Sequence, residues 1–240
     1  MQQSKIKKIA IGQTTVLNAS LMWFSIGLVA MLSVAGIFGF IPQMQDVAIK
    51  LFASRGFIIG LSFISIGLMI GISFGARKAK METLIFMFIA FALVEGFSLS
   101  MVLMRFAFKG ETGKILLLLL IPSLTMLGMG YLGYNQIFDF SKIGRFLIFS
   151  LIGLMLSGVI MIFIPGVKKM WTLYSIVGYG IFTLYVGFDL WRISRLDDML
   201  KITNNPDKSI VLRYGLIFGL SLLIDFIQLV WFLARLLLDN

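Results

Sequence analysis

The sequence contains no cysteine and no histidine, and only 13% of its 240 residues are charged. Without cysteine, disulfides and thiol chemistry are excluded. Without histidine, the chain lacks the commonest metal ligand, the usual general base and the usual switch near neutral pH. Any response to pH near neutrality must therefore come from carboxyl groups in unusual surroundings.

Apolar residues, in contrast, make up 59% of the chain, which predicts an integral membrane protein. The net charge is +10, but the basic residues lie in short segments between apolar runs. We therefore interpret this charge as a determinant of membrane topology and expect no nucleic-acid partner. The apolar run after the basic start "MQQSKIKKIAIGQTTV" is too long for a signal-peptide core, so we expect a retained first span.

Seven apolar runs approach the length of about 20 residues that a helix needs to cross a bilayer. The short connections between them predict antiparallel neighbours in a single transmembrane domain, residues 1–240, with an all-α fold. The polar stretch 192–213 is expected to form the one long loop. Most Lys and Arg residues fall on the side of the N-terminus, which favours a cytoplasmic N-terminus. The predicted spans are 18–41, 56–76, 83–104, 115–134, 144–165, 171–191 and 213–236.

The last predicted span carries an acid, Asp225, within "LSLLIDFIQLVW". A charge in the bilayer core is costly, so an intramembrane acid is a candidate functional residue. Ser221 and Gln228 lie on the same helical face as Asp225. Helix packing is the better explanation for Ser221 and for the nearby Gly215 and Gly219.

Two further acids lie within predicted spans. Asp189 is one turn from Arg192, and the residues alone leave open whether Asp189 is functional or simply pairs with this arginine. Glu95 lies near mid-membrane, with Ser98 one turn later. It either belongs to a functional path or is a protonated acid that hydrogen-bonds a neighbouring helix.

Three segments resemble the Bax inhibitor-1 family. "SLLIDFIQLVWFLARLL" (221–237) resembles its last transmembrane segment, with Gln228 where asparagine is usual. "YSIVGYGIFTLYVGFDLWRI" (174–193) resembles the preceding segment, and "FMFIAFALVEGFSLS" (86–100) resembles the third span. The resemblance, which covers most of residues 10–238, suggests a bacterial-type member in the plasma membrane. It implies a seven-helix bundle in which six helices surround a central last helix.

The resemblance also implies a function, which is calcium leak across the membrane, gated by pH. The family's pair of gating aspartates corresponds to Asp189 and Asp225, which would also contact the permeating ion. A basic residue after the second span can pair with the sixth-span acid, and "ARKAK" offers Arg77 or Lys78 for this latch. The residues that could line the path are Glu95, Ser98, Ser221 and Gln228.

The chemistry of such a pair follows from electrostatics. Two carboxyl groups close together in a poorly solvated place cannot both ionise cheaply, so they share a proton that holds their helices together. Loss of the proton drives them apart unless a cation neutralises them, and Ca²⁺ prefers oxygen ligands. The expected partners are thus the lipid bilayer, protons and calcium ions, with no resident cofactor.

Other functions compete with this interpretation. The strongest rival is a non-conducting regulator that binds another membrane protein. A proton-coupled transporter stays open, because intramembrane carboxyl groups serve proton relays, although no paired, proline-broken helices are evident. An intramembrane aspartyl protease would need a Gly-x-Gly motif before its second acid, and "SLLID" has none. We therefore expect no enzymatic activity.

Overall fold

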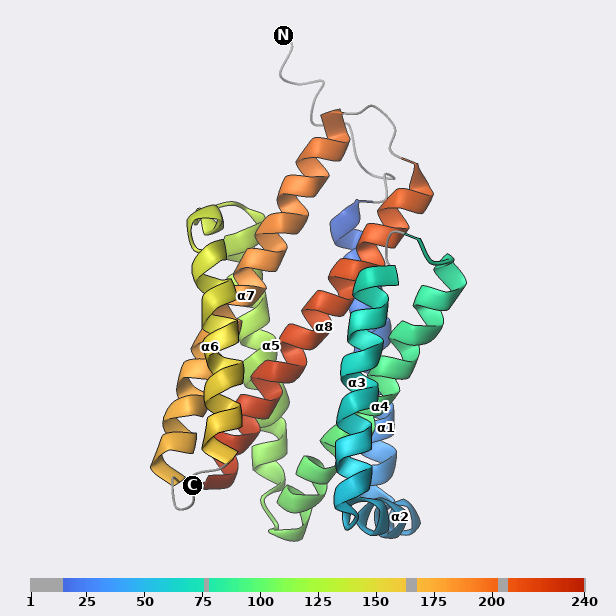
Figure 1. Ribbon diagram of the computed structural model, residues 1–240, viewed down its shortest axis with the longest axis vertical. Helices are drawn as coiled ribbons and strands as arrows, with labels where there is room; N and C mark the ends of the chain where they lie inside the picture. Colours follow the sequence, from blue (N-terminus) through green and yellow to red (C-terminus); the bar gives the residue numbers. More distant parts are fainter. Residues whose placement is uncertain (1–14, 76–77, 163–167, 203–206, 240) are drawn as a thin grey trace.

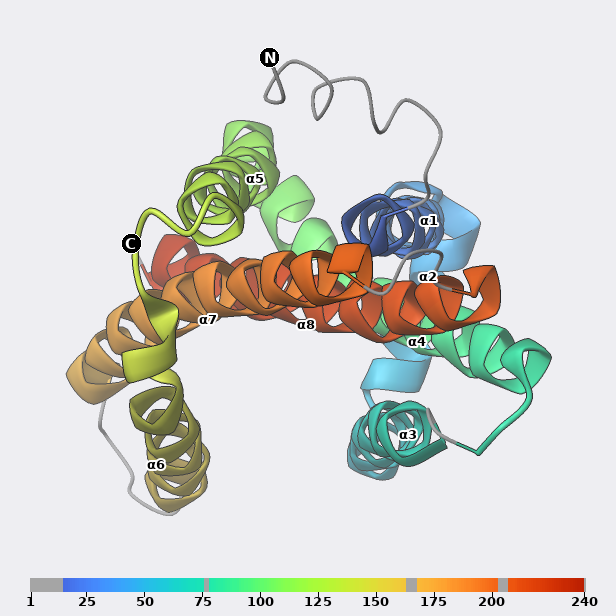
Figure 2. The ribbon, with the colours of Figure 1, turned by 90° about the horizontal axis from the view of Figure 1, so that it is seen from above.

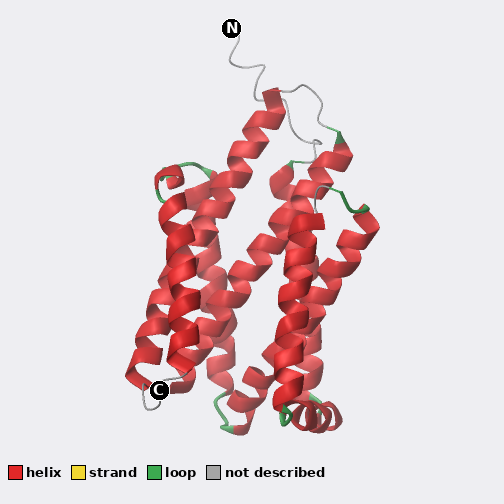
Figure 3. Cartoon of the chain, in the orientation of Figure 1, coloured by secondary structure: helices red, strands yellow, loops and turns green. Residues whose placement is uncertain are grey.

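The computed structural model describes residues 15–75, 78–162, 168–202 and 207–239. These residues form eight α-helices and one 3₁₀ turn, with no β-strand among them (Figures 1 and 3). The all-α prediction is confirmed for this part of the chain. The helices are α1 (Val16–Phe40), α2 (Pro42–Phe52), α3 (Arg55–Gly75), α4 (Met81–Phe108), α5 (Thr112–Tyr134), α6 (Gly144–Ile162), α7 (Lys168–Ile202) and α8 (Lys208–Asp239), with η2 (Phe140–Lys142) before α6.

Six of the described helices are long and apolar enough to cross a bilayer, namely α1, α3, α4, α5, α7 and α8. Helix α6, with 19 residues, coincides with the fifth predicted span and is shorter than these six helices. A crossing of the hydrocarbon core takes about 20 residues. The described helices therefore support a multi-pass membrane protein with six candidate spans, and the predicted count of seven is not confirmed.

Helix α2 was not expected from the sequence. It begins with Pro42 in its first turn, where the missing backbone N–H costs no hydrogen bond. The Gln45 side chain donates a hydrogen bond to the Gly39 carbonyl (2.6 Å) across the break from α1. At its other end the Phe52 ring stacks on Phe97 of α4, with 4.9 Å between the ring centroids. With 11 residues, α2 is too short to span a bilayer, and it lies at the end of the bundle beside α1 and α3 (Figure 1).

Helix α8 is the most buried of the six long apolar helices. In its most apolar window 72% of the residues are buried, against 6% to 39% in the other five. It runs obliquely between α1 and α4 on one side and α5 and α7 on the other (Figures 1 and 2). This arrangement agrees with the expectation of a central last helix.

Glycines allow α8 to approach α1 closely. A Cβ atom on Gly219 would lie 3.0 Å from the Ser20 carbonyl oxygen and 3.1 Å from the Phe24 backbone nitrogen. A Cβ on Gly215 would likewise collide with Ala19. Any side chain at these positions would push the helices apart, so the packing interpretation of both glycines is confirmed.

The prediction of a long loop over residues 192–213 was wrong. Helix α7 continues to Ile202 and α8 begins at Lys208, so the two helices take up most of this stretch. The polar residues that suggested a loop belong to helical extensions, and the end of α7 projects beyond the other helices (Figure 1). A helix that leaves the hydrocarbon continues where its far end finds tertiary contacts, and α7 finds them through Asp197.

Candidate functional site

Asp189 of α7 and Asp225 of α8 come together where these two helices pack. Their side chains are buried, with 5% and 4% of the residue surface exposed, and their charges act on each other. Apolar residues of the same helices, Val186, Leu222 and Leu229, belong to the buried cluster at this contact. The structure therefore brings the predicted pair of carboxyl groups into one poorly solvated place.

The Asp189 carboxyl has two partners besides the second aspartate. The Nη1 atom of Arg192, one turn later on α7, lies 3.2 Å from Oδ1, and the Ser221 hydroxyl of α8 also bonds this carboxyl. The Arg192 guanidinium lies 5.7 Å and 5.3 Å from the ring centroids of Phe188 and Phe218, which help to fix it. The Arg192 side chain is 49% exposed. It thus connects a buried acid to the surface of the molecule.

Asp225 has fewer partners. Its Oδ2 atom is buried and has no hydrogen-bond partner in the described part of the chain. An ionised carboxylate buried without a donor is strongly unfavourable, because it loses its hydration and gains nothing in return. In this arrangement Asp225 therefore needs a proton or a nearby cation. This requirement links its ionisation to the packing of α7 against α8.

The lengths of the two helices explain how these residues reach the same depth. Asp189 lies 13 residues before the end of α7, and Asp225 lies 17 residues after the start of α8. At 1.5 Å per residue these distances are about 20 Å and about 26 Å, a difference of about one helical turn. With a short connection between the two helix ends, both carboxyl groups lie at similar depth. The position of Arg192 near a predicted boundary suggested that the helix ends there. Helix α7 instead continues to Ile202.

Of the two predicted latch residues, Lys78 is the one that the structure describes. Lys78 is exposed and forms none of the ion pairs found among the described residues, whereas Asp189 pairs with Arg192. Arg77 lies outside the described residues. The segment is nevertheless close to α8, because Arg213 donates a hydrogen bond to the Ala79 carbonyl (3.0 Å). A latch formed by Arg77 stays a prediction.

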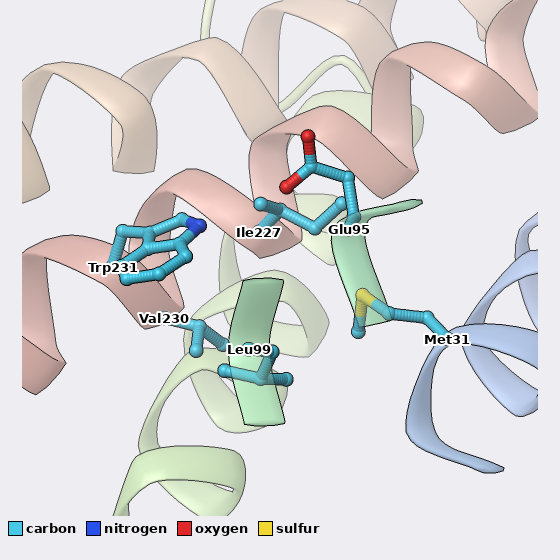
Figure 4. Close-up of a pocket in the computed structure, with 6 residues that line it drawn as sticks. All are labelled: Met31, Glu95, Leu99, Ile227, Val230 and Trp231. Carbon is cyan, nitrogen blue, oxygen red and sulfur yellow. The ribbon is translucent and has the colours of Figure 1, made fainter. Parts of the chain in front are cut away.

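Glu95 occupies a second polar site, on α4 next to a different part of α8. Its carboxylate accepts hydrogen bonds from the Ser65 hydroxyl of α3 and from the Trp231 indole of α8. Figure 4 shows this carboxylate beside Ile227 and Trp231, with Met31 nearby. The site therefore joins three helices through neutral donors. These contacts fit the alternative of an acid that hydrogen-bonds a neighbouring helix, and a role of Glu95 in the path stays a prediction.

The other residues predicted to line the path are less distinctive. Ser98 is half-buried, and its hydroxyl bonds the Val94 carbonyl of its own helix (3.1 Å). Gln228 is half-buried, one turn after Asp225 on α8. Only Ser221, through Asp189, belongs to the aspartate site by a hydrogen bond.

Asp197 is a buried acid that sequence reasoning missed. Its Oδ1 accepts a hydrogen bond from the Val16 backbone N–H (2.7 Å), and its Oδ2 accepts one from Leu17 N–H (3.3 Å). The Tyr134 hydroxyl lies 3.4 Å from the same Oδ2. The Asp197 carboxylate therefore caps the backbone N–H groups at the start of α1, which have no acceptor within their own helix. It links α7 to α1 and α5. Its spacing of eight residues from Asp189, on the same face of α7, was a signal that could have drawn attention to it.

The described residues contain no group of three or more acidic, histidine or cysteine side chains that could hold a metal ion. Calcium takes six to eight oxygen ligands, and the aspartate pair offers only two carboxyl groups. The pair therefore lacks the number of oxygen ligands that a tight calcium site needs.

Comparison with known proteins places these features in a family. The protein-family model described as "Inhibitor of apoptosis-promoting Bax1" matches residues 13–240 of this chain. A protein of Borreliella burgdorferi described as uncharacterized is 29% identical over 195 residues, which is 81% of this chain and 80% of the relative. The inner membrane protein YbhL of Escherichia coli K12 is 25% identical over 214 residues, or 89% of this chain and 86% of the relative. The extent of the family match shows that this chain belongs to the Bax inhibitor-1 family.

Proposed function

We propose that this chain is a pH-sensitive calcium leak channel of a bacterial inner membrane and that it has no enzymatic activity. The buried pair of Asp189 and Asp225, with an oxygen of Asp225 that lacks a donor, is the observation that carries this proposal. The name of the Escherichia coli relative supports the location. The six long apolar helices are those of a multi-pass membrane protein.

The gate works by the balance of charge at the α7–α8 contact. At acidic pH one proton is shared by the two carboxyl groups, which keeps the helices together and the path closed. As the pH rises the proton is lost, and two negative charges in a dry place repel each other. Arg192 compensates one of them, so the remaining charge attracts a cation. Calcium then replaces the proton as the neutralising ion while the path is open.

Calcium flux from liposomes tests the proposal. Purified protein is reconstituted with a calcium dye in the lumen, and influx is recorded from acidic to alkaline pH for the wild type and Asp225→Asn. We expect wild-type flux to rise with pH, by at most about tenfold per pH unit for one proton. Asp225→Asn should lose this dependence, because asparagine does not ionise. Asp46→Asn, the same chemical change at an exposed position of α2, should behave as the wild type.

Two results would end the proposal. Asp225→Asn with the flux and pH profile of the wild type would exclude the gate. A wild type with no flux above protein-free liposomes would exclude the channel and favour the non-conducting regulator. In that case, crosslinking in the native membrane should then find a stoichiometric membrane-protein partner.

A further inference from the structure

A groove of about 440 Å³ lies between α1 and α5, on the opposite side of α8 from α3. Its floor is made by buried apolar residues of the two central helices, Leu190 of α7 with Leu222 and Phe226 of α8. Its walls are apolar side chains of α1 and α5, such as Leu21 and Leu127. A volume of this size is within the range of sites that bind small organic molecules.

The groove opens to the surface that faces lipid. The wall residues Leu21 and Leu127 are 42% and 71% exposed, and Tyr131 is exposed as well. These residues lie on helices long and apolar enough to cross the membrane. Water would find few hydrogen-bond partners along the apolar length of this groove, so the bilayer itself supplies the natural occupant.

The dimensions of the groove fit one leaflet of a bilayer. On α1 its lining extends from Leu17 to Leu28, a separation of 11 positions, which corresponds to about 16 Å of helix. The hydrocarbon core is about 30 Å thick, so a single leaflet contributes about half of that. A groove of this length accommodates one acyl chain that runs parallel to the helices.

The two ends of the groove differ in polarity. The end near the start of α1 is lined by Tyr131 and Tyr134 of α5 and by Asn135, which follows this helix. Tyrosine is enriched where the membrane meets water, because its ring is apolar and its hydroxyl is polar. The opposite end, near Leu28, is apolar except for Ser123, whose hydroxyl bonds its own helix at Leu119 (2.7 Å).

We propose that this groove is a lipid-binding site that holds one acyl chain of a phospholipid from the leaflet on the side of the α1 N-terminus. The headgroup lies at the Tyr131 and Asn135 end, and the chain covers the floor formed by Leu190, Leu222 and Phe226. The lipid thereby completes the apolar packing between α1 and α5. The groove floor shares Leu222 with the apolar cluster at the aspartate contact, but the binding of lipid does not depend on the proposed channel activity.

Retention of lipid by the full chain tests this proposal. The protein is incubated with dioleoyl phosphatidylglycerol in mild detergent and examined by native mass spectrometry. Leu21→Trp should fill the groove from α1, and Ser123→Phe should fill it from α5. Met22→Trp is the matched control, because Met22 neighbours Leu21, is 44% exposed and does not line the groove. Circular dichroism and gel filtration establish that each variant is folded.

We expect one bound lipid per wild-type chain and per Met22→Trp chain, and about tenfold less in either filling variant, which corresponds to about 1.4 kcal/mol of binding free energy. Equal retention by the folded filling variants would overturn the site, as would a wild type that retains no lipid. A dimer that Leu21→Trp abolishes and Met22→Trp preserves would identify a second copy as the occupant and also overturn the proposal. If one filling variant fails to fold, the variant on the opposite wall decides the result.

Discussion

Asp197 and Asp225 are equally buried acids in the same helical hairpin, each with 4% of its surface exposed, but their surroundings differ. Both oxygens of Asp197 are used, by the backbone N–H groups of Val16 and Leu17 and by Tyr134. Asp225 has an oxygen without a partner among the described residues and faces a second carboxyl group. Burial alone therefore does not distinguish a structural acid from a candidate switch.

The two acids differ in which ionisation state of the carboxyl group their surroundings stabilise. A carboxylate that accepts hydrogen bonds from backbone amides at a helix start is stabilised in its charged form. A carboxyl group opposite another acid is stable only when a proton or cation is shared. Asp197 thus belongs to the framework at one end of the bundle, and Asp225 to a contact whose stability depends on ionic conditions.

The largest effect on stability is expected for Asp197→Ala. This change removes the acceptor of one buried and one partly buried backbone donor at the start of α1, and an unsatisfied buried donor costs about 1–3 kcal/mol. We predict a loss of about 2–4 kcal/mol in the free energy of unfolding, measured by denaturation in detergent. Asp198→Ala, an exposed neighbour that bonds Gln136, should cost less than about 1 kcal/mol. Equal losses for the two variants would contradict the structural role of Asp197.

Asp225→Asn should have the opposite sign. Asparagine carries no charge, so it removes the electrostatic repulsion with the neighbouring Asp189 carboxyl. We predict an unfolding free energy that is unchanged or higher by about 1 kcal/mol at neutral pH. The same denaturation measurement checks it. A loss as large as that of Asp197→Ala would show that Asp225 is also a framework residue.

Arg192→Gln should alter the pH response more than the stability. The ion pair with Asp189 is half exposed and contributes about 0.2–1 kcal/mol. Without the positive charge, ionisation of the pair is less favourable, so half-maximal calcium flux should require a higher pH. Arg195→Gln is the control, since Arg195 lies over Trp191, with 5.4 Å to the ring centroid. An unchanged flux profile for Arg192→Gln would remove Arg192 from the gate.

Ser65→Ala should have the smallest effect on the pH profile of calcium flux. It removes the hydroxyl that donates to Glu95 but leaves the Trp231 donor in place. We predict a loss of about 1 kcal/mol in unfolding free energy and a pH profile of flux equal to that of the wild type. Liposome flux checks the second point. A shifted profile would mean that Glu95 takes part in gating and is more than a link between helices.

The transmembrane helices were predictable because apolar length is a strong signal. Predictions failed where tertiary contacts decide the structure. Helix α2 is short and contains Gln43, Gln45 and Asp46, so it has no apolar run to reveal it. The end of α7 looked like a loop because its polar residues were taken as the end of the helix. In fact, α7 continues past the predicted boundary, where its Asp197 contacts Val16 of α1 and Tyr134 of α5.

The aspartate pair could be proposed from motifs, but its geometry could not. The sequence placed Asp189 near Arg192 and Asp225 deep in its helix, and their proximity depends on where α7 ends. Asp197 was missed because its main partners are backbone amides about 180 residues away, which no side-chain motif reports. Partners of this kind become visible only once the helices are packed.

A double-mutant cycle on calcium flux tests the shared proton most directly. The pH profile of liposome influx is recorded for the wild type, Asp189→Asn, Asp225→Asn and the double variant, with equal reconstitution verified for each. If the two carboxyl groups act as one unit, either single change removes the pH dependence and the double variant shows no further effect. Independent effects that add in the double variant, or a normal profile in either single variant, would contradict the account.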